Sequence, residues 1–317
     1  GIIPNMFPDA PNPPLYNTVD ASLWFFQAIY AYYEATHDST FIKDNLFRTM
    51  KRIIKAYQEG TSFSIHMDTD GLIHAGSGLD QVTWMDVRIN NIVVTPRHGK
   101  PVEINALWYN ALMIMDYFTN LFDEPNLAYL ELSKRVNYSF NQKFWNSKRN
   151  CLYDVIDAYD ESIRPNQVYA TSLSFPIVGK TRGKKLLQVV KKELLDIYGL
   201  RTLSIHDPRF IPIYDGPIEK RDFAYHMGTT WPFLLGGYCE GYLKMHSFSP
   251  QAFGHVKKII LRFKTHLQEG SLNGIAEIFD GDQGTISRGC HTQAWSVGEI
   301  MRIYTQYLLQ EDTYAHR

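Results

Sequence analysis

The sequence predicts an all-α fold in which paired helices close into a ring, an α/α toroid. Apolar residues recur with helical spacing along most of the 317 residues, and this period is the primary signal for helices. Segments that are apolar around most of the helix alternate with amphipathic segments. A helix that is apolar all round must be buried. An inner ring of buried helices inside an outer ring of amphipathic helices is therefore the expected packing.

About nine helices are expected from this period. The buried helices are expected at residues 18–36, 103–122, 164–177, 225–244 and 291–309. Their amphipathic partners are expected at residues 41–58, 126–144, 181–197 and 249–268. Short polar links within each pair favour antiparallel hairpins, and Ser39 and Ser249 are the expected N-caps.

One segment departs from the helical period. Residues 62–75 alternate in polarity and contain Asp70-Gly71, a dipeptide typical of a hairpin turn, so we expect a small β-hairpin there. No linker, low-complexity segment or change of composition divides the sequence, which predicts one domain over residues 1–317. The first residue is Gly1 rather than Met, and no signal peptide pattern follows it. We therefore expect a domain excised from, or preceded by, upstream segments of a longer protein.

Composition excludes several classes of partner. The net charge of −1 and the pI of about 6.9 give no electrostatic footprint for nucleic acid or an anionic membrane. No apolar run reaches the roughly 18 residues that span a bilayer. The three cysteines are far apart and the 11 histidines form no ligand motif, so no disulfide framework, metal or other cofactor is expected. A reducing, cytoplasmic compartment and a neutral substrate fit this composition.

Polar clusters occur just before or at the start of the predicted inner helices. They mix carboxylates, amides and tryptophans, and they lie at residues 16–20, 83–86, 101–105, 164–167, 226–232 and 277–282. In a ring of helical hairpins, the connections that lead into inner helices gather at one end, where function is expected. A crater of amides, carboxylates and indoles suits a sugar, which presents hydroxyl groups around its ring and apolar faces above and below.

Two carboxyl groups in these clusters have the surroundings that glycosidic hydrolysis needs. One carboxyl must donate a proton to the leaving oxygen. Asp86 follows Trp84 and Met85, which we expect to exclude water and raise its pKa. The other must stay ionised and hold a water molecule, and Glu277 lies in a polar connection rich in glycine and aspartate. Opposite walls of a helical barrel would leave roughly 6.5–9.5 Å between the carboxyls, the inverting geometry.

These residues also have ordinary structural interpretations. Asp86 can cap a short helix or pair with Arg88, and Glu277 can pair with Arg288. His226 can be a satisfied core histidine. Three tryptophans within apolar helical patterns are expected in the core, namely Trp24, Trp108 and Trp295. Two aspartate pairs have calcium-loop spacing but lack the full EF-hand pattern, so turns are expected at Asp68 with Asp70 and at Asp280 with Asp282.

Eight short motifs lie along nearly the whole chain. They are IPN (3–5), YNTVDASLWF (16–25), TWMD (83–86), PRHGKPVEINALWYN (96–110), RPNQ (164–167), YHMGTTWP (225–232), EIFDG (277–281) and QAWS (293–296). A single motif such as TWMD would carry little weight. Together, and in this order, they resemble the glucosidase half of glycogen debranching enzymes, so the chain is similar to the amylo-α-1,6-glucosidase domain of that family.

The resemblance implies an (α/α)6 barrel related to glucoamylases, with Asp86 as general acid and Glu277 as general base. It implies inverting hydrolysis of the single α-1,6-linked glucose left on a limit dextrin of glycogen. Glycogen, limit dextrin or another α-glucan is then the expected partner. Motif positions expected to line the pocket are Asn17, Asp20, Trp84, Glu103, Asn166, Gln167, His226 and Trp231.

Family members usually carry a Gly-Arg-Asp-Thr motif and further helices upstream of the first of these motifs. The sequence lacks both, so we expect either that an upstream segment of the same protein completes the barrel, or that the chain is a fragment with an incomplete site. Transfer of oligosaccharides is not expected, because the glucanotransferase half of two-activity debranching enzymes is also absent.

Other functions stay open at this point. Another helical-barrel α-glucosidase, similar to glucoamylases, trehalases or oligosaccharide-trimming glucosidases, would use the same acid and base on a different linkage. A catalytically incomplete glucan-binding fragment would bind without turnover. An α/α toroid for prenyl or peptide cyclisation would need an aspartate-rich metal helix or a Cys/His zinc set, and the sequence has neither.

Overall fold

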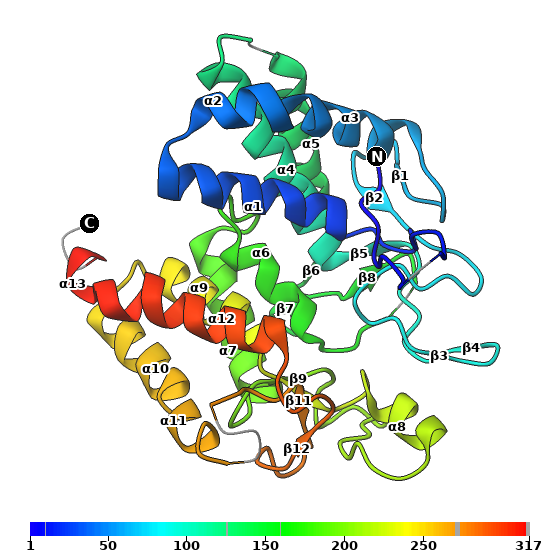
Figure 1. Ribbon diagram of the computed structural model, residues 1–317, viewed down its shortest axis with the longest axis vertical. Helices are drawn as coiled ribbons and strands as arrows, with labels where there is room; N and C mark the ends of the chain where they lie inside the picture. Colours follow the sequence, from blue (N-terminus) through cyan, green and yellow to red (C-terminus); the bar gives the residue numbers. More distant parts are fainter. Residues whose placement is uncertain (10, 125, 159, 270–272, 315–317) are drawn as a thin grey trace. The chain divides into compact units, whose positions relative to one another are not determined.

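Helices dominate the computed structural model, which describes residues 1–9, 11–124, 126–158, 160–269 and 273–314 (Figure 1). The small sheets lie in the connections, so the predicted helical class is confirmed. The chain divides into two units. Unit 1 comprises Gly1–Trp145, Val155–Asp160 and Leu173–Ile177, and unit 2 comprises Asn146–Asp154, Glu161–Ser172 and Val178–Arg317. None of the described helices is both long and apolar enough to cross a membrane.

Unit 1 is built around α4 (Val102–Leu121), which packs against α1 (Ala21–Thr36), α3 (Phe47–Glu59) and α5 (Leu127–Lys143). Figure 1 shows α4 and α5 side by side. Helix α4 is buried on nearly every face, as expected of an inner helix, and Trp108 at its centre is a core residue as predicted. The short helix α2 (Ser39–Phe41) and a π-helical turn (Ile42–Leu46) lead into α3.

Small antiparallel sheets occupy the connections of unit 1. They are β1 (His66–Met67) with β2 (Ile73–His74), β3 (Arg88–Ile89) with β4 (Ile92–Val93), and β5 (Lys100–Pro101) with β8 (Val155–Ile156). Strand β6 (Trp145–Asn146) follows α5. The β1–β2 pair is the predicted hairpin: Gly71 adopts φ +84° and its N–H donates to the carbonyl of Asp68 at 2.9 Å. Glycine suits this position of the turn because it adopts a positive φ without a steric cost.

Unit 2 gathers its helices around α9 (Leu234–Met245). The helices that contact α9 are α6 (Tyr169–Ser172), α7 (Lys180–Glu193), α10 (Pro250–Ile260), α12 (Ala294–Gln306) and the 3-10 turn η2 (Pro165–Val168). The remaining short helices are α8 (Ile218–Ala224), α11 (Phe263–His266), η3 (Leu308–Gln310) and α13 (Glu311–Tyr314). Ser249 caps α10, because its hydroxyl accepts from the N–H of Ala252, as predicted.

A four-stranded antiparallel sheet in unit 2 has no counterpart in the sequence-based expectations. Its order is β12 (Ser287–Arg288), β11 (Ile278–Phe279), β10 (Thr230–Trp231) and β9 (Leu200–Arg201). Strand β7 (Cys151–Leu152) lies outside it. In the sheet, Thr230 pairs with both Arg201 and Phe279. This pairing sets the segment that follows Glu277 beside the segment that contains Trp231.

Two predicted helices are wrong in extent. The helix expected at residues 164–177 is reduced to η2 and α6, because Pro176 disfavours a helical conformation at the preceding residue. The helix expected at residues 225–244 starts only at Leu234, since β-branched Thr230 joins the sheet and Pro232 follows Trp231. In both cases a proline outweighs the apolar helical pattern around it.

Four finer expectations are also wrong. Helices α1 and α12 are not buried all round: Met301 on α12 is 53 % exposed, and Trp295 is 37 % exposed rather than in the core. Trp24 on α1 is only partly buried. Ser39 is not an N-cap, because the carboxylate of Asp38 accepts from the N–H of Phe41 at 2.9 Å and caps α2 instead.

Candidate active site

Glu277 is held in place by donors on both of its carboxylate oxygens. The hydroxyl of Tyr225 donates to Oε1, and the backbone N–H of Cys290 donates to Oε2 at 2.8 Å. The N–H of Glu277 donates in turn to the carbonyl of Cys290 at 2.9 Å. The side chain is 7 % exposed. A carboxylate that accepts a hydrogen bond on each of its oxygens is held in one orientation.

Gly289 makes room for this carboxylate. A Cβ atom at position 289 would lie 2.4 Å from Oε2 of Glu277, and the backbone there adopts φ +66°. Both the space and the left-handed conformation therefore require glycine. Arg288, the partner suggested for Glu277 by the sequence, pairs instead with Asp280 at 3.0 Å and with Asp215 at 3.4 Å.

Aromatic rings surround the tyrosine that contacts Glu277. The Tyr225 ring lies 4.9 Å from Trp231 and 5.3 Å from Tyr214, and His226 stacks on Trp231 at 5.3 Å. The indole of Trp231 donates to the hydroxyl of Thr229 at 2.9 Å. Trp231 and His226 are both 1 % exposed. The predicted site residues His226, Trp231 and Glu277 thus belong to one neighbourhood in unit 2.

Asn166 and Gln167 are buried in the same unit, where each forms hydrogen bonds with neighbouring segments. Asn166 donates to the carboxylate of Asp154 at 2.8 Å. Gln167 accepts from the N–H of Leu152 at 3.1 Å and donates to the carbonyl of Arg164 at 2.9 Å. The guanidinium of Arg164 in turn donates to the carbonyl of His226 at 2.8 Å. The RPNQ segment is therefore tied directly to the segment that carries His226.

The Asp86 side of the predicted site lies in unit 1. Asp86 is exposed in a loop, while the preceding Met85 is buried, so the expected exclusion of water from Asp86 is not met. Asn17 donates to the carbonyl of Gln81 at 3.4 Å, and the N–H of Val19 donates to the carbonyl of Val82 at 2.8 Å. The start of α1 therefore runs beside the segment that leads to Asp86 and its neighbour, the partly buried Trp84.

Asp20 is the second carboxyl in this region. The hydroxyl of Thr18 donates to its Oδ1 at 2.7 Å. Burial raises the pKa of Asp20, the hydrogen bond from Thr18 opposes that shift, and the charge of Asp86 adds to it. Asp20 and Asp86 are thus close enough to interact electrostatically.

Glu103 occupies a different setting, at the first turn of α4. It forms a buried ion pair with Arg97, in which Nη2 of Arg97 donates to Oε2 of Glu103 at 2.5 Å and Nη1 donates to Oε1. The structure therefore places this predicted pocket residue in a two-point interaction with a neighbouring arginine.

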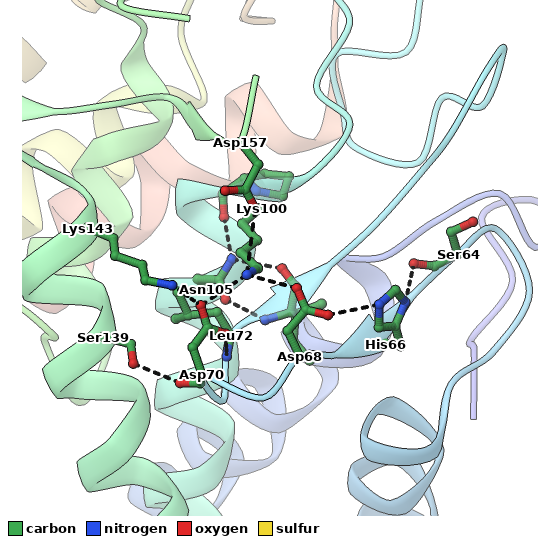
Figure 2. Close-up of polar contacts among 12 residues, drawn as sticks. Ser64, His66, Asp68, Asp70, Leu72, Lys100, Asn105, Ser139, Lys143 and Asp157 are labelled. Atoms are coloured by element: carbon green, nitrogen blue, oxygen red, sulfur yellow. Dashed lines mark hydrogen bonds and ion pairs between the residues drawn. The ribbon is translucent and has the colours of Figure 1, made fainter. Parts of the chain in front are cut away.

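A second ionic network in unit 1 centres on Lys100 of β5 (Figure 2). Its ammonium lies 2.8 Å from Asp68, 3.0 Å from Asp70 and 3.6 Å from Asp157. Lys143 of α5 also donates to Asp70. These contacts fasten the turn of the β1–β2 hairpin to the strand that leads into α4. The predicted turn at Asp68 and Asp70 is confirmed, and both carboxylates accept from a lysine.

Two comparisons place the chain among known proteins. A protein-family model described as amylo-alpha-1,6-glucosidase matches residues 1–302. The chain belongs to this family. It is also 23 % identical to the glycogen debranching enzyme of Saccharomyces cerevisiae over 409 aligned residues, which cover 96 % of the chain and 27 % of that enzyme. The chain thus spans about a quarter of the length of the curated relative it matches.

In this amylo-α-1,6-glucosidase family member, the sequence analysis did not predict the residues that contact the predicted site and turn residues. Tyr225 and Cys290 contact Glu277, Arg97 pairs with Glu103, and Lys100 anchors the hairpin. The signal that could have identified these partners is their position within or beside the family motifs. Among the described residues, no group of three or more His, Cys, Asp and Glu side chains is arranged to hold a metal ion.

Proposed function

We propose that this amylo-α-1,6-glucosidase family member is an inverting glycoside hydrolase. Its substrate would be the single α-1,6-linked glucose that remains as a branch stub on a glycogen limit dextrin. The observation that carries the proposal is the buried carboxylate of Glu277, held by a donor on each oxygen and adjoining an aromatic cluster. The family match over residues 1–302 supports the substrate class.

In the proposed reaction, Asp86 donates a proton to the glycosidic oxygen as the bond to the anomeric carbon breaks. Glu277 accepts a proton from a water molecule whose oxygen attacks that carbon from the opposite face. The products are β-glucose and a linear α-glucan. A general base needs a fixed orientation, and two hydrogen-bond donors supply it for Glu277. Exposure to water suits Asp86 for recovering its proton after each turnover.

The remaining predicted site residues take supporting roles in this proposal. Asn17, Asp20 and Trp84 would border the acid, while His226 and Trp231 would border the base. Glu103, Asn166 and Gln167 would shape the pocket through their buried contacts. We further propose that the helices belong to an (α/α)6 toroid completed by an upstream domain of the same protein, since the chain corresponds to only 27 % of its yeast relative. A cytoplasmic location fits its three free cysteines.

Glucose release from phosphorylase limit dextrin that carries α-1,6 glucosyl stubs tests the proposal. Panose, maltose and trehalose serve as competing substrates, and NMR identifies the anomer released first. We expect β-glucose from the stubs and little from maltose or trehalose. Asp86→Asn and Glu277→Gln should each reduce the rate by about 10²–10⁴-fold with the fold intact. Faster cleavage of maltose or trehalose would indicate another α-glucosidase, and glucan binding without turnover would indicate a binding module.

A further inference from the structure

We propose that Tyr225 is the positioning residue of the catalytic base, orienting the Glu277 carboxylate through its hydroxyl group. This inference rests on the proposed function, because it gives Tyr225 a role only if Glu277 is the base. Tyr225 lies 52 residues from Glu277 in the sequence, on the segment between α8 and β10, and its hydroxyl donates to Oε1. Oε2 is already engaged by the backbone N–H of Cys290 at 2.8 Å. The two donors therefore fix both the position and the rotation of the carboxylate plane.

Tyr225 is itself immobilised, as a positioning group must be. Its carbonyl accepts from the hydroxyl of Thr229 at 2.6 Å and from the indole of Trp231 at 3.2 Å. Its ring lies 4.8 Å from His226 and 5.3 Å from Tyr214. These ring contacts and the anchored backbone hold Tyr225 in place while its hydroxyl donates to Glu277.

Tyr225→Phe isolates this effect, because it removes the hydroxyl and keeps the ring. We expect kcat to fall about tenfold or more with KM nearly unchanged, since the base is misoriented in the reacting complex. Tyr214→Phe is the matched control, because it removes the hydroxyl of an adjoining tyrosine for which the described structure shows no hydrogen bond to Glu277. It should leave both quantities unchanged.

A second readout needs no turnover. The carboxyl-carbon resonance of Glu277 can be followed by NMR in protein labelled with ¹³C at the glutamate carboxyl carbons, with Glu277→Gln to assign it. Tyr225→Phe should shift this resonance, because it removes a hydrogen bond to the carboxylate, and Tyr214→Phe should not. An unchanged resonance and an unchanged kcat in Tyr225→Phe, with Glu277→Gln inactive, would overturn the role of Tyr225 and leave the proposed function standing. Near-full activity of Glu277→Gln would instead overturn the proposed base, and the role of Tyr225 with it.

Discussion

The carboxylate of Glu103 and the guanidinium of Arg97, six residues apart, form a buried two-point ion pair at the first turn of α4. An ion pair removed from water is costly to break, because the remaining charge is left buried without its partner. We expect Arg97→Met to destabilise the fold by about 3–5 kcal/mol, measured by urea unfolding. The double variant Arg97→Met with Glu103→Leu should recover part of the loss, since no unpaired charge then remains.

This pair also bears on the predicted pocket role of Glu103. If Glu103 acts mainly through Arg97, Glu103→Gln should lower the free energy of unfolding and change KM only in proportion to the unfolded fraction. A variant that unfolds like the parent but has a strongly raised KM would instead indicate direct contact with the sugar.

The Lys100 network should make the stability of unit 1 sensitive to acid. Burial alone would raise the pKa values of Asp68 and Asp70, but hydrogen bonds from Lys100 to both, and from Lys143 to Asp70, outweigh it and lower them. A carboxyl with a lowered pKa in the folded state adds stability above its unfolded value of about 3.9. That stability is lost as the pH falls through the folded pKa. We therefore expect a steep loss of unfolding free energy below about pH 4.

Lys100→Met tests this network. It should destabilise the protein at pH 7 and flatten the acid dependence of the unfolding free energy, because Asp68 and Asp70 lose their shared cation. Lys143→Met is the matched control, since Lys143 is half exposed and exposed ion pairs contribute only about 0–1 kcal/mol. Equal effects of the two substitutions would contradict a central role for Lys100.

Gly289 should be intolerant of any side chain. Gly289→Ala would place a methyl group against Oε2 of Glu277 and strain a backbone with positive φ. We expect hydrolysis to fall by about 10²-fold, as for a misplacement of about 1 Å at a catalytic group. Gly298→Ala in α12 is the control, because nothing lies within 4 Å of the added Cβ atom. It should be neutral or more stable by up to about 1 kcal/mol. Similar activities for the two variants would contradict this assignment.

Cys290 offers a chemical probe of the Glu277 charge. The charge of Glu277 is the main reason that the pKa of this exposed thiol is raised, so the reactive thiolate is scarce at neutral pH. Glu277→Gln should lower the pKa of Cys290 and increase its rate of alkylation by iodoacetamide at pH 8 several-fold. Cys151 is the internal control, because burial raises its pKa to about 11. An alkylation profile that does not shift would mean that Glu277 carries no charge beside the thiol.

The helices were largely predictable, since their apolar period persists over many residues and short links separate the pairs. The hairpin at Asp70-Gly71 was also predictable, because its turn chemistry is local. The four-stranded sheet was not, since two-residue strands such as Thr230–Trp231 have no period, and their pairing depends on segments far apart in the sequence. The exposed faces of α1 and α12 were not predictable either, because the apolar composition of both helices favoured burial on all sides.

For the site, the sequence supplied candidate carboxyls but not their partners. Tyr225 meets Glu277 across 52 residues, and the pairing of β10 with β11 helps to bring their segments together. The exposure of Asp86 was mispredicted because a buried Met85 does not determine which way the next side chain faces, and Asp86 is exposed. Local composition does not reveal which of two neighbours faces the solvent.

The π-helical turn at Ile42–Leu46 has a consequence for which side chains reach the core. Its hydrogen bonds join residues five apart, and the N–H of Phe47 donates to the carbonyl of Ile42. Ile42 and Phe47, one at each end of this turn, are both buried. At 3.6 residues per turn, an α-helix would set two side chains five residues apart on different faces. The wider turn instead lets both of them pack inward.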